Sequence, residues 1–434
     1  MPLAYQRDEK HPMVDVLLRT RVPRWEELNR AIDERDDMLD FAIKLFEHDR
    51  DRALVNYFQN ALDQLELVRH IAGWRRYSKR MLDFASGYGR LTRLLVHEKL
   101  ADEVTVSDIL EGGMEFQAQQ FGVRTILSTT LPENFAAPEK YDLIFVASLF
   151  THLPPPTFLS WLRRLTELLE PEGLLIFSVH DESIAPEAVD GILFATNSES
   201  RVLDTSEYGS TWVSESYVRE QVAAIDPSFA CVRLPRALAD WQDVYVVSPA
   251  PIANPLPRRR PRGFVERFDV LENGVRISGW ATVGEEKPDR IRIALDDDVI
   301  ATTREFFARP DVAEWLGIDP SSPTGWEIVI PHAGIRSYRY QVATVSAFSR
   351  EGTERIFFLG TMDSLNSQVA RDWRNELERK LDTRTREIDA LEERLSAADV
   401  DRAALRQLIA LMKESKFWKA REQWLAIKRK FGVR

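Results

Sequence analysis

An aspartate, a glycine-rich turn and the start of a basic helix follow one another within residues 81–95, MLDFASGYGRLTRLL. Asp83 ends an apolar run, and Gly87 and Gly89 come after it. A turn of this kind, between a strand and a helix, brings backbone N–H groups close to a ligand. A carboxylate at the end of the first strand repels a pyrophosphate, but it suits a ligand that carries an ammonium group there.

A second acid, Asp108, ends the apolar run VTVSD, nineteen residues beyond Gly89. At the tip of a second strand its carboxylate can accept hydrogen bonds from both hydroxyls of a ribose. A ligand with a ribose, a positive amino group and no phosphate fits both acids, and S-adenosylmethionine is such a ligand. A nicotinamide dehydrogenase is a weaker interpretation, because the dinucleotide motif carries its acid only after the glycines.

The composition limits the classes of function. The 434 residues suffice for two or three domains, and the net charge of −11 disfavours a nucleic-acid partner. The single cysteine, Cys231, excludes an internal disulfide framework. The N-terminus lacks the apolar core of a signal peptide, and no window approaches a membrane span. We therefore expect a cytoplasmic protein.

Residues 80–250 alternate short apolar runs with helical patterns, which predicts a doubly wound, Rossmann-like α/β domain of seven strands with a parallel sheet covered on both faces. Two late runs, FACVRLP and DVYVVSP, could add an antiparallel pair. Residues 1–79 show apolar residues at three- and four-residue steps and predict an N-terminal helical cap.

The chain changes character after residue 250. Residues 251–263 are rich in proline and arginine and predict a linker. Residues 264–362 alternate apolar and polar residues between turns, which indicates a small antiparallel β-sandwich, with Trp280 as a core residue.

Residues 363–412 predict a coiled coil, and hence self-association. Apolar residues occupy a and d of one heptad frame at Leu381, Ile388, Leu391, Leu395, Ala398, Leu405, Ile409 and Met412. Arg384 and Arg402 interrupt this frame, so a lone surface helix folded onto the sandwich is the alternative. Residues 413–434 predict a basic amphipathic helix for peripheral contact with an anionic membrane, with docking on a protein as the alternative.

The region 80–250 resembles the class I S-adenosylmethionine-dependent methyltransferases. LDFASGYGRLTRLL resembles their first motif, VTVSDI their second-strand acidic motif, and YDLIFVASLFTHLP their fourth strand. LTELLEPEGLLIFSVHD resembles the helix, turn and fifth strand that follow. The family usually has glycine where this chain has Ala85, and we expect the methyl group to be tolerated because a positive φ is not needed at every glycine of the loop.

The resemblance implies roles for individual residues. The amino-acid end of the cofactor would be lined by Asp83, Ser86, Gly87 and Gly89. Arg90 would meet the cofactor's carboxylate or be an exposed helix-face arginine. Further along the strand ends, Asp108 would hold the ribose, Ile109 would face the adenine, Ser128 would edge it or serve as a turn serine, and Ser148 would lie beneath the sulfonium.

Two histidines fall at the carboxyl ends of predicted strands, where the reacting groups of such a sheet stand. His152 follows the fourth strand and His180 ends the fifth, and either could take a proton from a hydroxyl acceptor. The alternative for each is a hydrogen bond to a loop backbone. Tyr208 and Trp212, in the long segment 181–213, could face the acceptor under a lid, or could pack over the sheet edge. We expect no metal site.

The regions after residue 250 resemble parts of bacterial cell-surface polysaccharide enzymes. The sandwich is similar to an accessory domain of such enzymes, and the tail to one found on glycosyltransferases. This resemblance implies a sugar hydroxyl as acceptor, in a glycan or lipid-linked glycan such as O-antigen or capsule, with glycosyltransferases as partners at the inner face of the cytoplasmic membrane. A small-molecule or protein methyltransferase, and a coiled-coil scaffold or chain-length regulator, are the alternatives.

Overall fold

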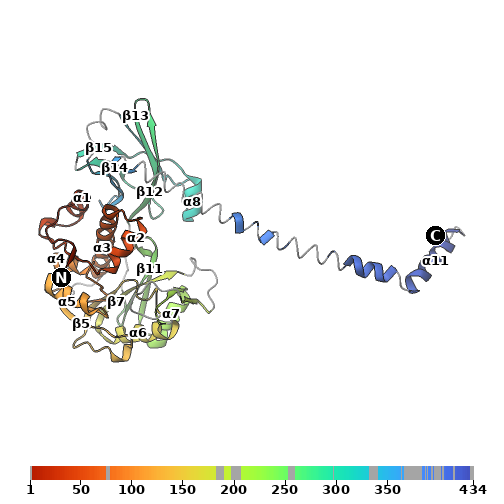
Figure 1. Cartoon of the computed structure of the whole chain (residues 1–434), viewed down its shortest axis with the longest axis horizontal. Coiled ribbons are helices and arrows are strands. Elements are labelled where there is room, and N and C mark those ends of the chain that lie inside the picture. Colours follow the sequence, from red (N-terminus) through yellow and green to blue (C-terminus); the bar gives the residue numbers. More distant parts are fainter. Residues whose placement is uncertain are drawn as a thin grey trace. The chain divides into compact units, whose positions relative to one another are not determined.

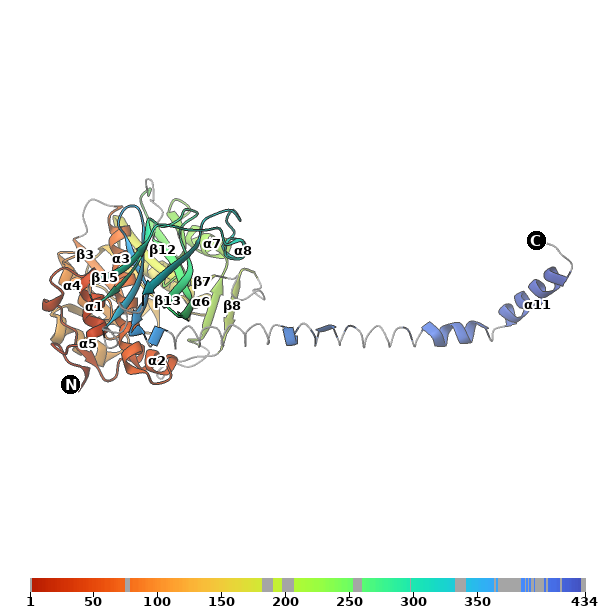
Figure 2. The ribbon, with the colours of Figure 1, turned by 90° about the horizontal axis from the view of Figure 1, so that it is seen from above.

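The computed structural model describes the chain in two compact units, Met1–Asp363 and Ser364–Arg434 (Figures 1 and 2). Within them, the described residues are 2–74, 79–181, 190–196, 207–252, 260–296, 298–331, 341–362 and 364–365, followed by 384–386, 388, 390–391, 394, 402, 405–413 and 416–430. The predicted lid and linker therefore fall partly outside the described residues, at 182–189, 197–206 and 253–259.

The N-terminal part is mainly helical. Its elements are β1 (Leu3–Tyr5), α1 (Pro12–Arg21), η1 (Trp25–Glu27), β2 (Ile32–Asp33), α2 (Asp37–Leu45) and α3 (Arg50–Ala72). Side chains that accept backbone N–H groups begin the last two helices: Asp36 accepts from Met38 before α2, and Asp49 accepts from Arg52 before α3. The pair β1–β2 is antiparallel and lies beside these helices.

A mixed sheet forms the centre of the first unit, as the alternating pattern predicts. Its main path runs in the order β10-β11-β7-β6-β3-β4-β5, with parallel pairing from β7 to β5 and antiparallel pairing of β10–β11 and β11–β7. The strands are β3 (Arg80–Phe84), β4 (Glu103–Asp108), β5 (Arg124–Leu127), β6 (Tyr141–Val146), β7 (Leu169–Asp181), β10 (Ala230–Leu238) and β11 (Gln242–Ser248). The antiparallel pair at the edge is the one that the two late runs predict.

Helices cover both faces of this sheet. Alternate residues of β7 enter different apolar clusters: Ile176 packs with residues of α3 and α4, and Phe177 packs with residues of α6 and α7. This two-sided burial explains the nearly continuous apolar runs of the strands. The helices, with one 3-10 turn, are α4 (Thr92–Glu98), α5 (Glu111–Phe121), η2 (Pro132–Asn134), α6 (Pro155–Glu167) and α7 (Glu215–Ile225).

The segment after β7 adds two short strands to the described sheet. β9 (Ser210–Val213) pairs in parallel with the end of β7, and β8 (Ile192–Ala195) pairs antiparallel with β9. The predicted count of seven strands is not confirmed, because the described sheet has nine. The described part of 181–213 thus extends the sheet edge.

Two antiparallel sheets follow, in the place of the predicted sandwich. One has the order β12-β13-β16 and the other β15-β14-β17-β18. Their elements are β12 (Pro261–Leu271), β13 (Gly274–Val283), β14 (Arg290–Leu295), β15 (Asp298–Thr303), α8 (Pro310–Leu316), β16 (Gly325–Pro331), β17 (Ala343–Phe348) and β18 (Glu354–Gly360). Ile277 and Trp326 of the first sheet and Ile293 and Val345 of the second are buried between them. The sequence analysis is wrong about Trp280, which lies partly exposed beside the exposed Trp315.

The second unit contains α11 (Lys416–Lys430) and shorter helical stretches before it. The described apolar residues of the predicted heptads, Ile388, Leu391, Leu405, Ile409 and Met412, are all about half exposed or more. Leu381, Leu395 and Ala398 lie outside the described residues, so the coiled coil stays a prediction. Among the described helices, none is long and apolar enough to cross a membrane.

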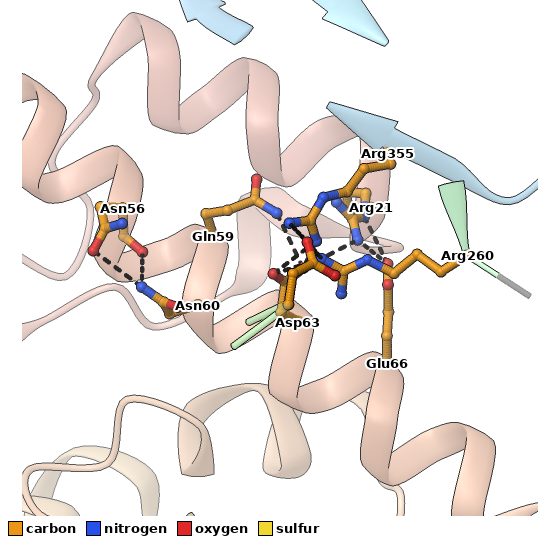
Figure 3. Close-up of polar contacts among 9 residues, drawn as sticks. Arg21, Asn56, Gln59, Asn60, Asp63, Glu66, Arg260 and Arg355 are labelled. Carbon is orange, nitrogen blue, oxygen red and sulfur yellow. Dashed lines mark hydrogen bonds and ion pairs between the residues drawn. The ribbon is translucent and has the colours of Figure 1, made fainter. Parts of the chain in front are cut away.

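A buried ionic cluster joins the sandwich to the helical part of the first unit (Figure 3). Asp63 of α3 accepts hydrogen bonds from Arg260, at 2.9 Å, and from Arg355 of β18, at 2.9 and 3.1 Å. Arg355 also binds Asp240, at 2.7 Å, and Arg21 of α1 approaches Asp63 to 3.9 Å while binding Glu66. Because the Asp63 side chain is only 3% exposed, its charge depends on these arginines for stabilisation.

We predict that Asp63→Asn lowers the free energy of unfolding by about 3–5 kcal/mol, since it leaves buried guanidinium groups without their shared carboxylate. Glu27→Gln is the control, because the Arg24–Glu27 pair is exposed and such pairs contribute at most about 1 kcal/mol. Urea unfolding of both variants tests this. Equal losses in the two variants would contradict the stabilising role of the cluster.

Candidate functional site

Asp83 lies next to last in β3 and is 4% exposed. Its Oδ2 accepts a hydrogen bond of 2.8 Å from the hydroxyl of Thr92, at the start of α4. The pKa of Asp83 is raised to about 7, mainly by burial and in part by the charge of the neighbouring Asp108, against the opposing effects of Thr92 and Arg90. A cation placed beside this carboxyl would relieve the cost of ionising it.

Asp108 ends β4, the neighbour of β3 in the sheet. Its Oδ2 accepts the N–H of Gly87 at 2.8 Å, and its Oδ1 accepts the N–H of Leu110 at 3.0 Å. Burial raises its pKa, and these backbone hydrogen bonds act in the opposite direction. Since a carboxylate has about four lone-pair positions, each oxygen keeps capacity for a further donor such as a hydroxyl.

The turn between β3 and α4 has left-handed backbone conformation at three positions: φ is +58° at Ala85, +55° at Gly87 and +77° at Gly89. The expectation that Ala85 avoids a positive φ is therefore wrong, and the alanine carries a strain of about 1 kcal/mol that glycine would not. A Cβ atom built on Gly87 would meet nothing within 4 Å. The turn is thus open at Gly87, as a ligand site requires.

Helix α5 holds this turn from behind, which the sequence analysis missed. Gln117 donates from its Nε2 to the hydroxyl of Ser86 and to the carbonyl oxygen of Gly87, both at 2.9 Å. A Cβ atom at Gly113 would stand 2.5 Å from the carbonyl oxygen of Gly87, so only glycine allows this approach. The Gly112–Gly113 pair was the signal available in the sequence.

The remaining predicted cofactor residues lie along the same edge of the sheet. Ser128 donates its backbone N–H to the carbonyl oxygen of Asp108 at 2.8 Å, and Ile109 is half-buried beside that strand end. Ser148 follows β6 with φ +59°, and its hydroxyl bonds the side-chain amide of Gln242 at 3.0–3.1 Å. The guanidinium of Arg90 lies 6.0 Å from the ring centre of Tyr57, an aromatic partner that the sequence analysis missed.

His152 is held in one orientation by two contacts. Its Nδ1 lies 2.7 Å from the carbonyl oxygen of Gly209, and its ring stacks on Tyr208 with centroids 4.5 Å apart. A carbonyl oxygen can only accept, so Nδ1 carries the proton and, in the neutral ring, Nε2 carries the lone pair. This is the tautomer that a base acting through Nε2 needs.

His180, near the end of β7, pairs with Trp212 across β7 and β9, and the two rings are 5.9 Å apart. The pKa of His180 is lowered to about 4, mainly by burial and in part by the proximity of His152, against the opposing effect of a hydrogen bond with the backbone of Thr211. Its Nδ1 is buried and has no hydrogen-bond partner among the described residues. The ring is therefore neutral at physiological pH and offers an acceptor.

Arg233 of β10 binds three acids, among them Asp181, the residue after His180. Arg233 was not among the predicted site residues. It lies 2.5 Å from Asp181, 2.6 Å from Asp243 and 2.7 Å from Glu215. Asp181 is thus engaged by a guanidinium. Among the described residues, no three His, Cys, Asp or Glu side chains gather as a metal site would require.

The site therefore has two groups of residues. Asp83, Asp108 and the glycine turn stand at the ends of β3 and β4, and His152 and His180 stand near the ends of β6 and β7. Ser178 connects the second group to Ser148, because its hydroxyl accepts the N–H of Ser148 at 2.8 Å. The carboxyl edge of a parallel sheet is where such folds bind their ligands.

Residues 46–193 match the family model of a methyltransferase domain. No curated protein matches the chain significantly. Among solved structures, the chain is similar to the DhpI–SAH complex, at 17% identity over 49% of this chain and 96% of that one, with a TM-score of 0.34.

Two further likenesses have similar scores. A S-adenosylmethionine-dependent methyltransferase from Clostridium acetobutylicum is 14% identical over 49% of this chain and 97% of its own, with a TM-score of 0.36. The N-methyltransferase NodS from Bradyrhizobium japonicum, in complex with S-adenosylhomocysteine, is 16% identical over 42% and 82%, with a TM-score of 0.29.

We predict that Asp83→Asn stabilises the ligand-free protein at high pH. With a folded-state pKa of about 7, Asp83 binds a proton in the folded state that the unfolded state has lost between about pH 4 and pH 7, so its contribution to stability falls as the pH rises through that window. The variant should exceed wild type in unfolding free energy by about 1–3 kcal/mol at pH 8 and by much less near pH 5.

Urea unfolding at several pH values measures this difference. Glu220→Gln, which removes an exposed negative charge, is the control. A difference between Asp83→Asn and wild type that does not change with pH would contradict the buried-carboxyl account.

Proposed function

We propose that this chain is an S-adenosylmethionine-dependent methyltransferase that transfers the methyl group to a sugar hydroxyl of a bacterial cell-surface glycan. The observation that carries the first half is the pair of buried acids, Asp83 and Asp108, around an open glycine turn. The cofactor and the acceptor in this proposal depend on different residues and are tested separately.

Asp83 would bind the ammonium group and Asp108 the ribose hydroxyls, with the remaining lone pairs described above. Gly87, where the turn is open, lies beside Asp108, because its N–H donates to the Asp108 carboxylate. Of the other predicted residues, Ser86 and Gly89 would line the amino-acid end, Arg90 would bind its carboxylate, Ile109 and Ser128 would flank the adenine, and Ser148 would lie beneath the sulfonium.

The charge at this edge favours a cationic ligand. The charge of Asp37 raises the pKa of Asp108, and the charge of Asp108 raises the pKa of Asp83, where Arg90 acts in the opposite direction. S-adenosylmethionine carries a net positive charge, with sulfonium and ammonium against one carboxylate. Its binding would compensate acids whose pKa values are raised by burial.

The bound cofactor supplies a methyl group that its sulfonium has already activated. The protein then has to align the acceptor oxygen, exclude water and take one proton. We assign proton removal to Nε2 of His152, since Gly209 fixes its tautomer and Tyr208 its ring plane. As the acceptor oxygen takes up this methyl group and the cofactor is left as the neutral thioether, the hydroxyl proton would pass to Nε2 of His152.

His180 would act as an acceptor for a hydroxyl of the bound sugar, because its Nδ1 is buried, neutral and oriented by β7. Trp212 and Tyr208 flank the two histidines and would contact the sugar through their ring faces. Two histidines flanked by aromatic rings support a sugar hydroxyl, rather than a protein side chain, as the group that is methylated.

The sandwich supports the glycan half of the proposal. On the outer face of the β12-β13-β16 sheet, Trp280 pairs with Phe264, and the ring of Phe307 lies over Gly325, its other neighbour in the sheet. Trp315 of α8 is 63% exposed, with its ring centre 5.6 Å from that of Trp280. Exposed aromatic rings contact the C–H faces of sugar rings, and Arg309 with Glu266 lies beside them for hydroxyl groups.

The second unit supports self-association and membrane contact. Its described heptad residues expose apolar side chains that a second copy would cover. Trp424 is 55% exposed on a helix that also carries Lys416, Lys419 and Arg421, which suits an anionic membrane surface where lipid-linked glycans and glycosyltransferases would meet the enzyme.

We predict that the wild-type chain binds S-adenosylmethionine and that Asp108→Asn weakens binding at least about tenfold, because the ribose loses an ionised acceptor. Glu103→Gln, at the exposed opposite end of β4, is the control and should bind as wild type does. Isothermal titration measures both. Failure of the wild-type chain to bind would remove the enzymatic proposal and leave the scaffold alternative.

We predict that Trp315→Ala weakens binding of a cell-surface polysaccharide about 3- to 10-fold without changing cofactor affinity. Trp241→Ala is the control, because Trp241 is similarly exposed (54%) but lies between β10 and β11, outside the sandwich. Affinity electrophoresis measures the first quantity and titration the second. Methylation of a metabolite pool with no retention on any glycan would favour the small-molecule alternative.

A further inference from the structure

The guanidinium of Arg93 connects the glycine turn to the N-terminal helical part of the chain. Arg93 lies in α4, directly after the turn, and is 2% exposed. Its Nε donates to the carbonyl oxygen of Gly89 at 3.2 Å, and its Nη1 donates to the carbonyl oxygen of Ala31, next to β2, at 2.8 Å. One rigid side chain thus bridges two segments that are far apart in the sequence.

Tyr57 of α3 completes this bridge. Its hydroxyl accepts a hydrogen bond of 3.1 Å from Nη2 of Arg93 and donates one of 2.6 Å to Asp36. Tyr57 and Asp36 are buried, and Asp36 also begins α2 by accepting the N–H of Met38. The relay therefore runs from the start of α2 through α3 to the turn.

Arg90 lies against the same residues. Its guanidinium is 6.0 Å from the ring centre of Tyr57, and the charges of Asp36 and Asp83 both favour its cationic form. Arg90 thus stands between one acid of the helical part and the acid of the cofactor site. Removing the tyrosine hydroxyl would take a hydrogen-bond acceptor from Arg93 and leave the aromatic ring beside Arg90 in place.

We propose that Tyr57 and Asp36 are positioning residues of the cofactor site: by holding Arg93 against Gly89 they fix the turn that receives the amino-acid end of S-adenosylmethionine. This inference rests on the proposed cofactor binding. It assigns to α2 and α3 a role in cofactor affinity, so the helical part does more than cover an apolar face. A guanidinium with three acceptors in a fixed fork has the rigidity that such a role needs.

The alternative is that the relay only stabilises the fold, and the chain offers a matched control for it. Tyr5 is also fully buried in the helical part, and its hydroxyl donates to the carbonyl oxygen of Glu9 at 3.0 Å. Tyr5→Phe removes the same atom from the same region without touching the turn. A purely structural role predicts that the two variants behave alike at equal stability.

The experiment titrates full-length wild type, Tyr57→Phe and Tyr5→Phe with S-adenosylmethionine and measures urea unfolding of each. We expect the dissociation constant of the cofactor to be about tenfold larger for Tyr57→Phe than for wild type, and to be unchanged for Tyr5→Phe. If Tyr57→Phe does not fold, because Asp36 loses its donor, the double variant Asp36→Asn/Tyr57→Phe removes the uncompensated charge and should show the same weakening.

Failure of the proposed function and failure of the positioning role give different results. Wild type that does not bind contradicts the proposed function itself. Wild type that binds, with Tyr57→Phe or the double variant binding as tightly as Tyr5→Phe, overturns the positioning role and leaves the proposed function intact.

Discussion

The site depends on the burial of two carboxyl groups at the tips of neighbouring strands. Burial penalises the ionised form of both. The charge of Asp108 adds to this cost at Asp83, and the charge of Asp37 adds to it at Asp108. Thr92 and the backbone N–H groups of Gly87 and Leu110 offset part of this cost. The part of this cost that remains is relieved when a cationic ligand binds. The arrangement that destabilises the ligand-free protein at neutral pH therefore also favours a cationic ligand.

The surrounding structure keeps these acids in place. The turn is held by α5 through Gln117, and by the helical part through Arg93. Helix α3 carries both connections of the helical part: Tyr57 faces the turn, and Asp63, six residues on, binds the arginines of the sandwich. One helix therefore links the edge of the sheet that carries Asp83 and Asp108 to the sandwich.

Short-range patterns in the sequence predicted much of this arrangement. Strand–helix alternation predicted the parallel sheet, because strands buried on both faces must be continuously apolar. The acid-first order around Gly87 and Gly89 predicted the kind of ligand. The sequence could not show that Ala85 takes a positive φ, that Arg93 reaches Ala31, or that Trp280 faces outward, because each depends on packing between segments remote in the chain. Gln117 was missed for the same reason: a glutamine on an amphipathic helix carries no local sign of the turn it supports.

The central claim is that Asp83 must lose a proton when the cofactor's ammonium group binds. Titration with S-adenosylmethionine at pH 6.5, in two buffers of different ionisation enthalpy, measures the protons released on binding. With a pKa of about 7 in the empty site, the account predicts release of roughly 0.8 proton per cofactor, and close to none for Asp83→Asn if it still binds. Tight binding by wild type without proton release, or no heat in either buffer, would contradict it.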